Sequence, residues 1–122
     1  MCQVVSWRYS VSVNNDQLKI LSKMKKLIKL GKRRFQIRRD RDYLLDLLEL
    51  GISESEAWNV ILELNKHFYF NDPKPSYYKN TDTLIFKKQI NGVVAYIKLK
   101  IENNNNQEEI VVCISFHEDN RF

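Results

Sequence analysis

The stretch that decides the fold is residues 84–117, LIFKKQINGVVAYIKLKIENNNNQEEIVVCISFH. It contains three runs in which apolar and polar residues alternate, a pattern typical of strands that bury one face. Asn91-Gly92 separates the first two runs, and this dipeptide is typical of a type I′ hairpin turn. A polar loop at 102–108 separates the last two. The pattern predicts an antiparallel β-meander with one buried and one exposed face.

The register of these strands predicts which side chains share a face. The two-residue turn pairs Lys87 with Tyr96. In the second hairpin the apolar faces stay together when Leu99 pairs with Val112, and this pairing places Ser115 beside Tyr96. A slip of one residue would turn lysines toward the core, so this register is strongly selected. The polar face is expected to present Lys87, Gln89, Tyr96, Lys98, Lys100, Ser115 and His117.

Three helices and an edge strand are predicted before the meander. Apolar residues at helical spacing indicate a helix over 16–30. Asp40 can cap a second helix that stops at Gly51, and a capping box that begins at Ser53 starts the third. The alternation over 33–38 indicates a short strand at a sheet edge. Because the apolar sheet face must be covered, the expected fold is α+β, with three helices packed on a twisted antiparallel sheet.

Composition places the chain among small globular proteins. Its 122 residues suit one domain, and no apolar stretch approaches the roughly 20 residues that span a bilayer. The N-terminus shows no secretory signal, so the expected compartment is the cytoplasm. Cys2 and Cys113 form neither a disulfide framework nor a metal-binding CxxC motif. Both prolines fall in a predicted loop at 71–83, which is long enough to suggest a function.

Basic residues are concentrated in one segment of the chain. Eleven lysines and arginines lie between Lys19 and Arg41, against one acid, Asp40, and the net charge of the chain is +5. Such a block attracts nucleic acid, an acidic protein or an anionic membrane. The alternative is a solvated helix face with no partner. The candidate nucleic-acid-binding residues are Arg33, Arg34, Arg38, Arg39 and, on the sheet, Lys100.

The polar sheet face has the residue types that RNA cleavage through the 2′-hydroxyl requires. That reaction needs a base for the 2′-OH, an acid for the 5′-oxygen and cations for the phosphorane. His117 can act as acid or base near neutral pH. Lys87 and Lys98 can stabilise the phosphorane, while Tyr96 can bind phosphate or stack on a base. The scattered acids and the absence of a clustered ligand set argue against a metal-dependent nuclease, and the plain alternative is a solvated sheet face.

A series of short segments from Leu44 onward carries a resemblance to a known family: LGI at 50–52, NVILEL at 59–64, FY at 68–69, DPKP at 72–75, ING at 90–92, YIKLKI at 96–101 and VVCISFHE at 111–118. In their order and spacing these segments resemble the motility quorum-sensing regulator (MqsR) family of toxin–antitoxin ribonucleases. KKLI at 25–28 also fits the opening helix of the family. The resemblance covers roughly residues 20–118, so 16–122 is expected to be one toxin domain, preceded by an extension at 1–15.

This resemblance implies a RelE-like fold and a toxin that cleaves mRNA without a metal or other cofactor, arrests growth and is neutralised by a cognate antitoxin. Tyr96 matches the family's tyrosine, and His117 falls at its basic residue on the last strand. The family's glutamine falls near Lys87, with Gln89 two residues on. Its lysine after the third helix aligns with Asn71, so the candidate replacement is Lys74.

The competing hypothesis is a non-catalytic module of the same fold. Such a module would bind nucleic acid or a protein through the basic segment 19–41. The two exchanged family positions, glutamine and lysine, favour this alternative slightly. The sequence therefore leaves two functions open, an mRNA-cleaving toxin and a binding module.

Overall fold

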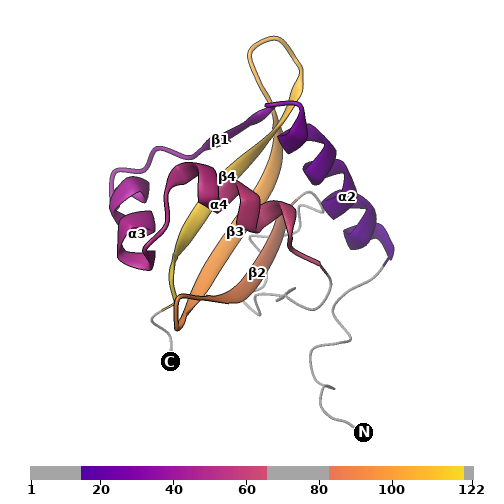
Figure 1. The fold of residues 1–122 in the computed structure, drawn as a ribbon. Coiled ribbons are helices and arrows are strands. Elements are labelled where there is room, and N and C mark those ends of the chain that lie inside the picture. The colour runs from indigo at the N-terminus through magenta and orange to yellow at the C-terminus, as the bar shows by residue number, and fades with distance from the viewer. Residues whose placement is uncertain (1–14, 66–82, 120–122) are drawn as a thin grey trace, which may run out of the picture.

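A computed structural model describes residues 15–65 and 83–119, which form a two-layer α+β fold (Figure 1). The described elements, in chain order, are α2 (Asn15–Lys29), β1 (Arg33–Phe35), α3 (Tyr43–Leu50), α4 (Glu54–Leu62), β2 (Thr83–Ile90), β3 (Val93–Asn103) and β4 (Glu109–Glu118). Most of the predicted 71–83 loop, including Lys74, lies outside the described residues, as does nearly all of the 1–15 extension. Among the described helices, none is long and apolar enough to cross a membrane.

The four described strands form one mixed sheet in the order β1-β4-β3-β2. Strands β2, β3 and β4 pair antiparallel, which confirms the predicted meander. β1 lies at the edge, as predicted, but it pairs parallel with β4, with Arg33 opposite Val111. The prediction of a wholly antiparallel sheet is therefore wrong. Periodicity reports that a segment is a strand, but it carries no information on the direction of the partner strand.

The first hairpin has the predicted register. Asn91 and Gly92 have φ values of 52° and 87°, the two positive values that a type I′ turn requires. Lys87 pairs with Tyr96 across this hairpin. The Asn91 side chain also donates a hydrogen bond of 2.8 Å to the carbonyl oxygen of Leu50, which ties the turn to the end of α3.

The second hairpin differs from the prediction because it contains a β-bulge. Lys98 pairs with Ser115, but Leu99 pairs with Cys113, so Ile114 is the extra residue of β4. The predicted pairing of Leu99 with Val112 is wrong. The bulge reverses the alternation along β4, and Tyr96 therefore lies opposite His117 and not Ser115.

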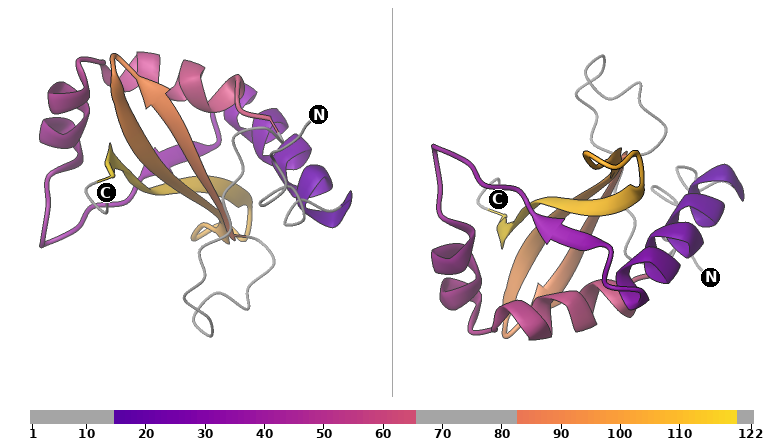
Figure 2. Two further views of the ribbon diagram at one scale, coloured as in Figure 1. Left: turned by 90° about the horizontal axis from the view of Figure 1, so that it is seen from below. Right: turned by 90° about the horizontal axis from the view of Figure 1, so that it is seen from above.

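One face of the sheet is covered by the helices, as Figure 2 shows. Apolar residues of α2 and α4 pack with the inward residues of the strands, and because of the bulge Val111, Cys113 and Phe116 all join this core. The largest fully buried side chains include Met24, Ile28, Leu47, Ile61, Phe86, Ile97 and Leu99. No described helix covers the opposite face of the sheet, so a functional site on the sheet is expected on this face.

The helix boundaries follow local capping chemistry, with one exception to the prediction. The predicted capping box is present at the start of α4, where Ser53 and Glu56 exchange hydrogen bonds of 3.1 and 2.8 Å. The cap of α3 is Asp42 and not Asp40, since Asp42 accepts a hydrogen bond of 2.9 Å from the amide of Leu44. Asp40 lies two residues before this cap and instead accepts hydrogen bonds from Arg38 at both carboxylate oxygens.

Candidate functional site

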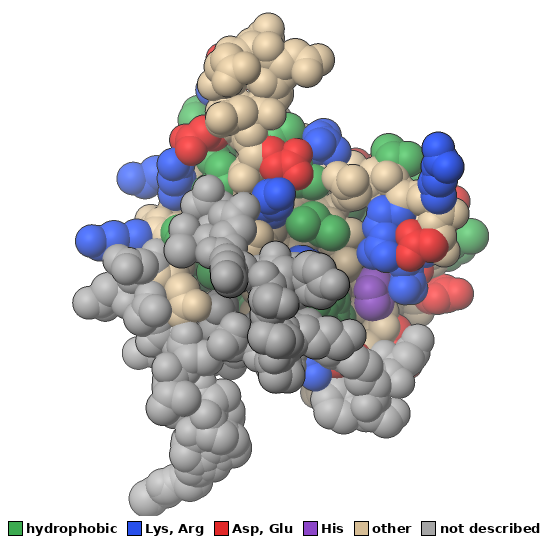
Figure 3. Space-filling model, turned by 180° about the vertical axis from the view of Figure 1, so that it is seen from behind, with side chains coloured by type: hydrophobic (Ala, Val, Ile, Leu, Met, Phe, Trp, Pro, Cys, Tyr) green, Lys and Arg blue, Asp and Glu red, His purple; other side chains and the backbone are tan. Residues whose placement is uncertain are grey.

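The sheet face opposite the helices brings four of the six predicted catalytic residues together in two adjoining rows. Lys87, Tyr96 and His117 are register partners across β2, β3 and β4. In the next row Lys98 lies beside Ser115. Figure 3 shows the histidine side chain of this face among basic and acidic side chains. The bulge in β4 creates this arrangement, because it places His117 directly opposite Tyr96.

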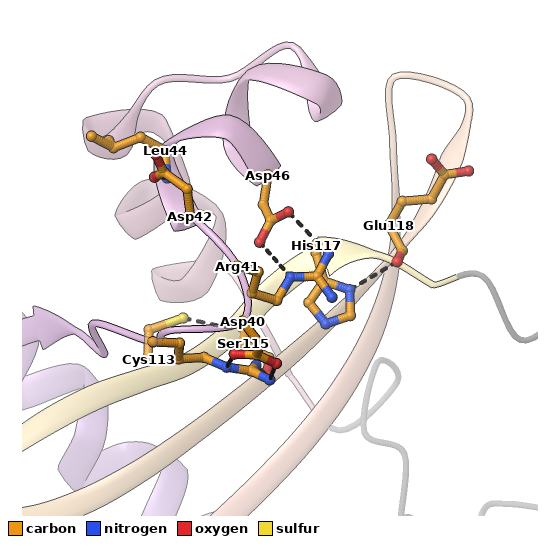
Figure 4. Close-up of polar contacts among 10 residues, drawn as sticks. Asp40, Arg41, Asp42, Leu44, Asp46, Cys113, Ser115, His117 and Glu118 are labelled. Atoms are coloured by element: carbon orange, nitrogen blue, oxygen red, sulfur yellow. Dashed lines mark hydrogen bonds and ion pairs between the residues drawn. The ribbon is translucent and has the colours of Figure 1, made fainter.

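Tyr96 and His117 form a stacked pair at the centre of the face. Their ring centroids are 5.6 Å apart and the ring planes differ by 19°. Both side chains are half-buried. His117 Nδ1 lies 2.8 Å from the carbonyl oxygen of Glu118 (Figure 4). A carbonyl oxygen only accepts hydrogen bonds, so this contact assigns a proton to Nδ1 and leaves Nε2 as the proton acceptor of the neutral ring.

Lys87 is held by a buried carboxylate that the sequence did not reveal as part of the site. Its Nζ lies 2.8 Å from an Asp119 oxygen, and the Asp119 side chain is only 2% exposed. The amide of Asp119 also donates to the carbonyl oxygen of Val94 at 2.8 Å, which fixes the residue beside β3. Asp119 lies two residues after His117, the last predicted strand residue, and resembles an ordinary surface acid in sequence. Asp119 could have been identified from its position just beyond His117, because the predicted strands place this end of β4 next to the row that contains Lys87.

Arg38 is the predicted nucleic-acid-binding residue that the structure places against this face. Its Nη1 donates a hydrogen bond of 3.2 Å to the Ser115 hydroxyl. Its Nε and Nη2 bind Asp40 at 2.9 and 2.6 Å. The hydrogen bonds from Arg38 hold the pKa of the exposed Asp40 carboxyl below its usual range. Arg38 thus connects the segment before α3 to the row that contains Lys98.

The other predicted basic residues are not gathered beside His117. Arg33 lies over the Trp58 ring at 5.4 Å and donates to the carbonyl oxygen of Ile28 at 3.0 Å, so it supports the helix layer. Arg34 and Lys100 instead share the carboxylate of Glu102, at 3.2 and 3.8 Å. Each of these three side chains was predicted to bind RNA, but each makes its contacts within the protein.

Two further predicted residues lie at the margins of the face. Arg39 is exposed on the segment between β1 and α3, and Gln89 is exposed near the first hairpin turn, opposite Val94. Neither lies in the two rows that contain Tyr96 and Lys98. The basic segment therefore divides into residues with different roles and does not form one continuous surface.

A small pocket of about 10 Å³, which is room for about one water molecule, lies between β4 and the segment that leads into α3. Its lining includes Arg38, Arg41, Asp46, Ser115 and His117, most of which appear in Figure 4. Sequence reasoning did not select Arg41 and Asp46, which form a two-bond ion pair at 2.8 and 2.9 Å. The ion pair itself is local, but its place beside β4 depends on how α3 docks against that strand, which the sequence does not show.

Comparison of the chain with models of protein families and with curated proteins finds no match to it. The resemblance to the MqsR family therefore stays a prediction, and the geometry of the sheet face is the observation that bears on function.

Proposed function

We propose that this protein is a metal-independent endoribonuclease that cleaves mRNA, arrests growth as the toxin of a type II toxin–antitoxin system in the cytoplasm, and is neutralised by a cognate antitoxin. The observation that supports this proposal most directly is the stacked pair of Tyr96 and His117, with Lys87 in the same row. The RelE-like character of the fold is part of the proposal, and the two-layer arrangement with one sheet face free of described helices is compatible with it.

The proposed reaction uses the groups of the two rows. Nε2 of neutral His117 accepts the proton of the 2′-hydroxyl as the 2′-oxygen attacks phosphorus. Lys98 and Lys87 stabilise the additional negative charge of the phosphorane. The bond to the 5′-oxygen then breaks, and that oxygen takes a proton, for which the Tyr96 hydroxyl is the candidate donor. The products are a 2′,3′-cyclic phosphate and a free 5′-hydroxyl.

The test is induced expression and in vitro cleavage by the wild-type chain and by the variants Tyr96→Phe and His117→Ala. We expect the wild type to arrest growth and to cut mRNA in the presence of EDTA. Each variant should lose about a hundredfold or more in cleavage rate, the usual size of a general acid–base contribution. Lys29→Ala, an exposed change on α2, is the matched control and should retain full activity.

Two results would overturn parts of this proposal. If the wild type neither arrests growth nor degrades mRNA, the toxin function is wrong. If the wild type cuts RNA and both site variants cut equally well, the activity is real but the site is elsewhere. A small helix-turn-helix protein encoded beside this reading frame would support the antitoxin part of the proposal.

One observation favours the non-catalytic binding module as a second candidate. Two cations of the face are neutralised within the protein, Lys87 by Asp119 and Arg38 by Asp40. A surface whose cations are already paired suits weak, reversible binding better than stabilisation of a phosphorane. Under this alternative the wild type shifts RNA in a gel without shortening it, and the variants Tyr96→Phe and His117→Ala change affinity but no rate.

A further inference from the structure

Arg41 is a second arginine at the candidate face, and a buried carboxylate fixes its orientation. Arg41 lies just before α3, and Asp46 lies on that helix with a side chain that is 10% exposed. The carboxylate accepts from Arg41 Nε at 2.8 Å and from Nη2 at 2.9 Å (Figure 4). This fork geometry holds the guanidinium in one plane.

The ion pair leaves part of the guanidinium available for another ligand. A guanidinium has five N–H donors, and Asp46 engages one at Nε and one at Nη2. The Arg41 side chain is 34% exposed, so its outer edge is accessible.

Arg41 shares its pocket with His117 and Ser115. Arg38 lines the same pocket and donates to the Ser115 hydroxyl. The pocket therefore has two guanidinium groups beside the imidazole that is proposed to accept the 2′-hydroxyl proton. Guanidinium donors that converge on one pocket are typical of sites that bind phosphate.

The two arginines differ in how firmly their carboxylate partners are held. Asp46 is buried and belongs to α3, so its bond to Arg41 persists when a ligand arrives. Asp40 is exposed on the connecting segment, so an RNA phosphate can replace it at Arg38. Displacement of Asp40 also removes a negative charge that would repel the phosphate.

Because the pocket is too small to hold a phosphate, we propose that Arg41, oriented by Asp46, binds a phosphate of the RNA substrate at the mouth of the pocket, beside His117, and that Arg38 joins it when the phosphate displaces Asp40. This inference rests on the proposed function. It adds Arg41 to the groups that contact RNA and makes Asp46 a positioning residue. In this arrangement the segment between β1 and α3 holds the RNA backbone against β4.

The experiment measures binding of a 2′-deoxy, non-cleavable oligonucleotide to the full chain by fluorescence anisotropy at several salt concentrations. Arg41→Ala should weaken affinity about tenfold and reduce the slope of log affinity against log salt by about 0.7, the contribution of one phosphate contact on a single strand. Arg41→Lys keeps the charge without the fork, so it should keep the slope and lose affinity severalfold. Asp46→Asn should behave like Arg41→Lys, because the cation remains but its orientation is lost.

Lys29→Ala, which removes one positive charge from α2, is the matched control. Thermal melting of each variant shows that it is folded, and if Arg41→Ala unfolds the chain, Arg41→Lys decides the question. If folded Arg41 variants bind and cleave RNA like the control, the inference is overturned while the ribonuclease function stands. If the wild type neither binds nor cleaves RNA, the proposed function fails, and this inference fails with it.

Discussion

At the scale of single residues, the ion pair between Lys87 and Asp119 is the contact on which the candidate face depends most. Both side chains are largely withdrawn from solvent, at 19% and 2% exposed. Asp119→Asn removes the charge and leaves the ammonium of Lys87 poorly compensated, so we expect the free energy of unfolding to fall by about 1–3 kcal/mol. Urea denaturation measures this loss. Glu118→Gln is the control, since Glu118 is exposed, and an equal effect of both changes would contradict the assignment.

The thiol of Cys113 gives a prediction about reactivity. Cys113 is buried in the core, and burial raises the pKa of its thiol well above the usual range. A raised pKa means less thiolate at a given pH, so Cys113 should react very slowly with Ellman's reagent at about pH 8 until the protein is unfolded. The measurement uses a Cys2→Ser background, which leaves one thiol. Rapid reaction of the folded variant would show that the thiol is accessible.

At the scale of elements, Gly51 joins the end of α3 to the first hairpin. Its φ is +79°, and an added Cβ would lie 3.0 Å from Asn91 Nδ2, the atom that donates to Leu50. Gly31 has a similar φ of +82°, but an added Cβ there meets nothing within 4 Å. Gly31→Ala should therefore cost only the backbone strain, about 1 kcal/mol, and Gly51→Ala about 1 kcal/mol more. Chemical denaturation of the two variants compares them, and equal losses would show that the Asn91 contact contributes nothing.

The elements also show where prediction from the sequence succeeds and where it fails. Asn91-Gly92 and the capping box at Ser53 were predictable because each depends on a few neighbouring residues. The bulge in β4 was not predictable. Residues 110–114 are all apolar, so either alternation of side chains would place apolar residues in the core. Because the bulge was not predicted, Ser115 and not His117 was expected opposite Tyr96, although both residues were correctly expected on the polar face of the sheet.

Within the site, sequence reasoning found the residues that lie on the predicted strands and missed those that depend on tertiary docking. Tyr96, Lys98 and His117 follow from alternation and lie together in the structure. Arg41 reaches the pocket only because α3 packs beside β4, and Asp119 is buried only by its neighbours in the fold. No local pattern in the sequence encodes either contact.

At the scale of the whole molecule, the fold separates positive charges that are continuous in the sequence. The basic segment 19–41 begins on α2, in the layer that covers the apolar sheet face, and ends beside the polar face (Figure 1). Lys19 and Lys26 are exposed on that helix. Arg38 and Lys98 flank Ser115 on the opposite face. A polyanion that binds in the proposed way therefore contacts only part of the block.

This division gives a prediction that separates specific contacts from net charge. The double variants Arg38→Gln/Lys98→Gln and Lys19→Gln/Lys26→Gln each remove two positive charges from the net +5, so they have the same net charge. If RNA binds the sheet face, the first variant should lower the salt slope of binding by roughly 1.4, two single-strand phosphate contacts, and the second should change it little. Anisotropy titrations over a range of salt concentrations measure both slopes. Equal slopes would mean that the chain attracts RNA by its overall charge, since only a localised interface can distinguish two variants that carry the same charge.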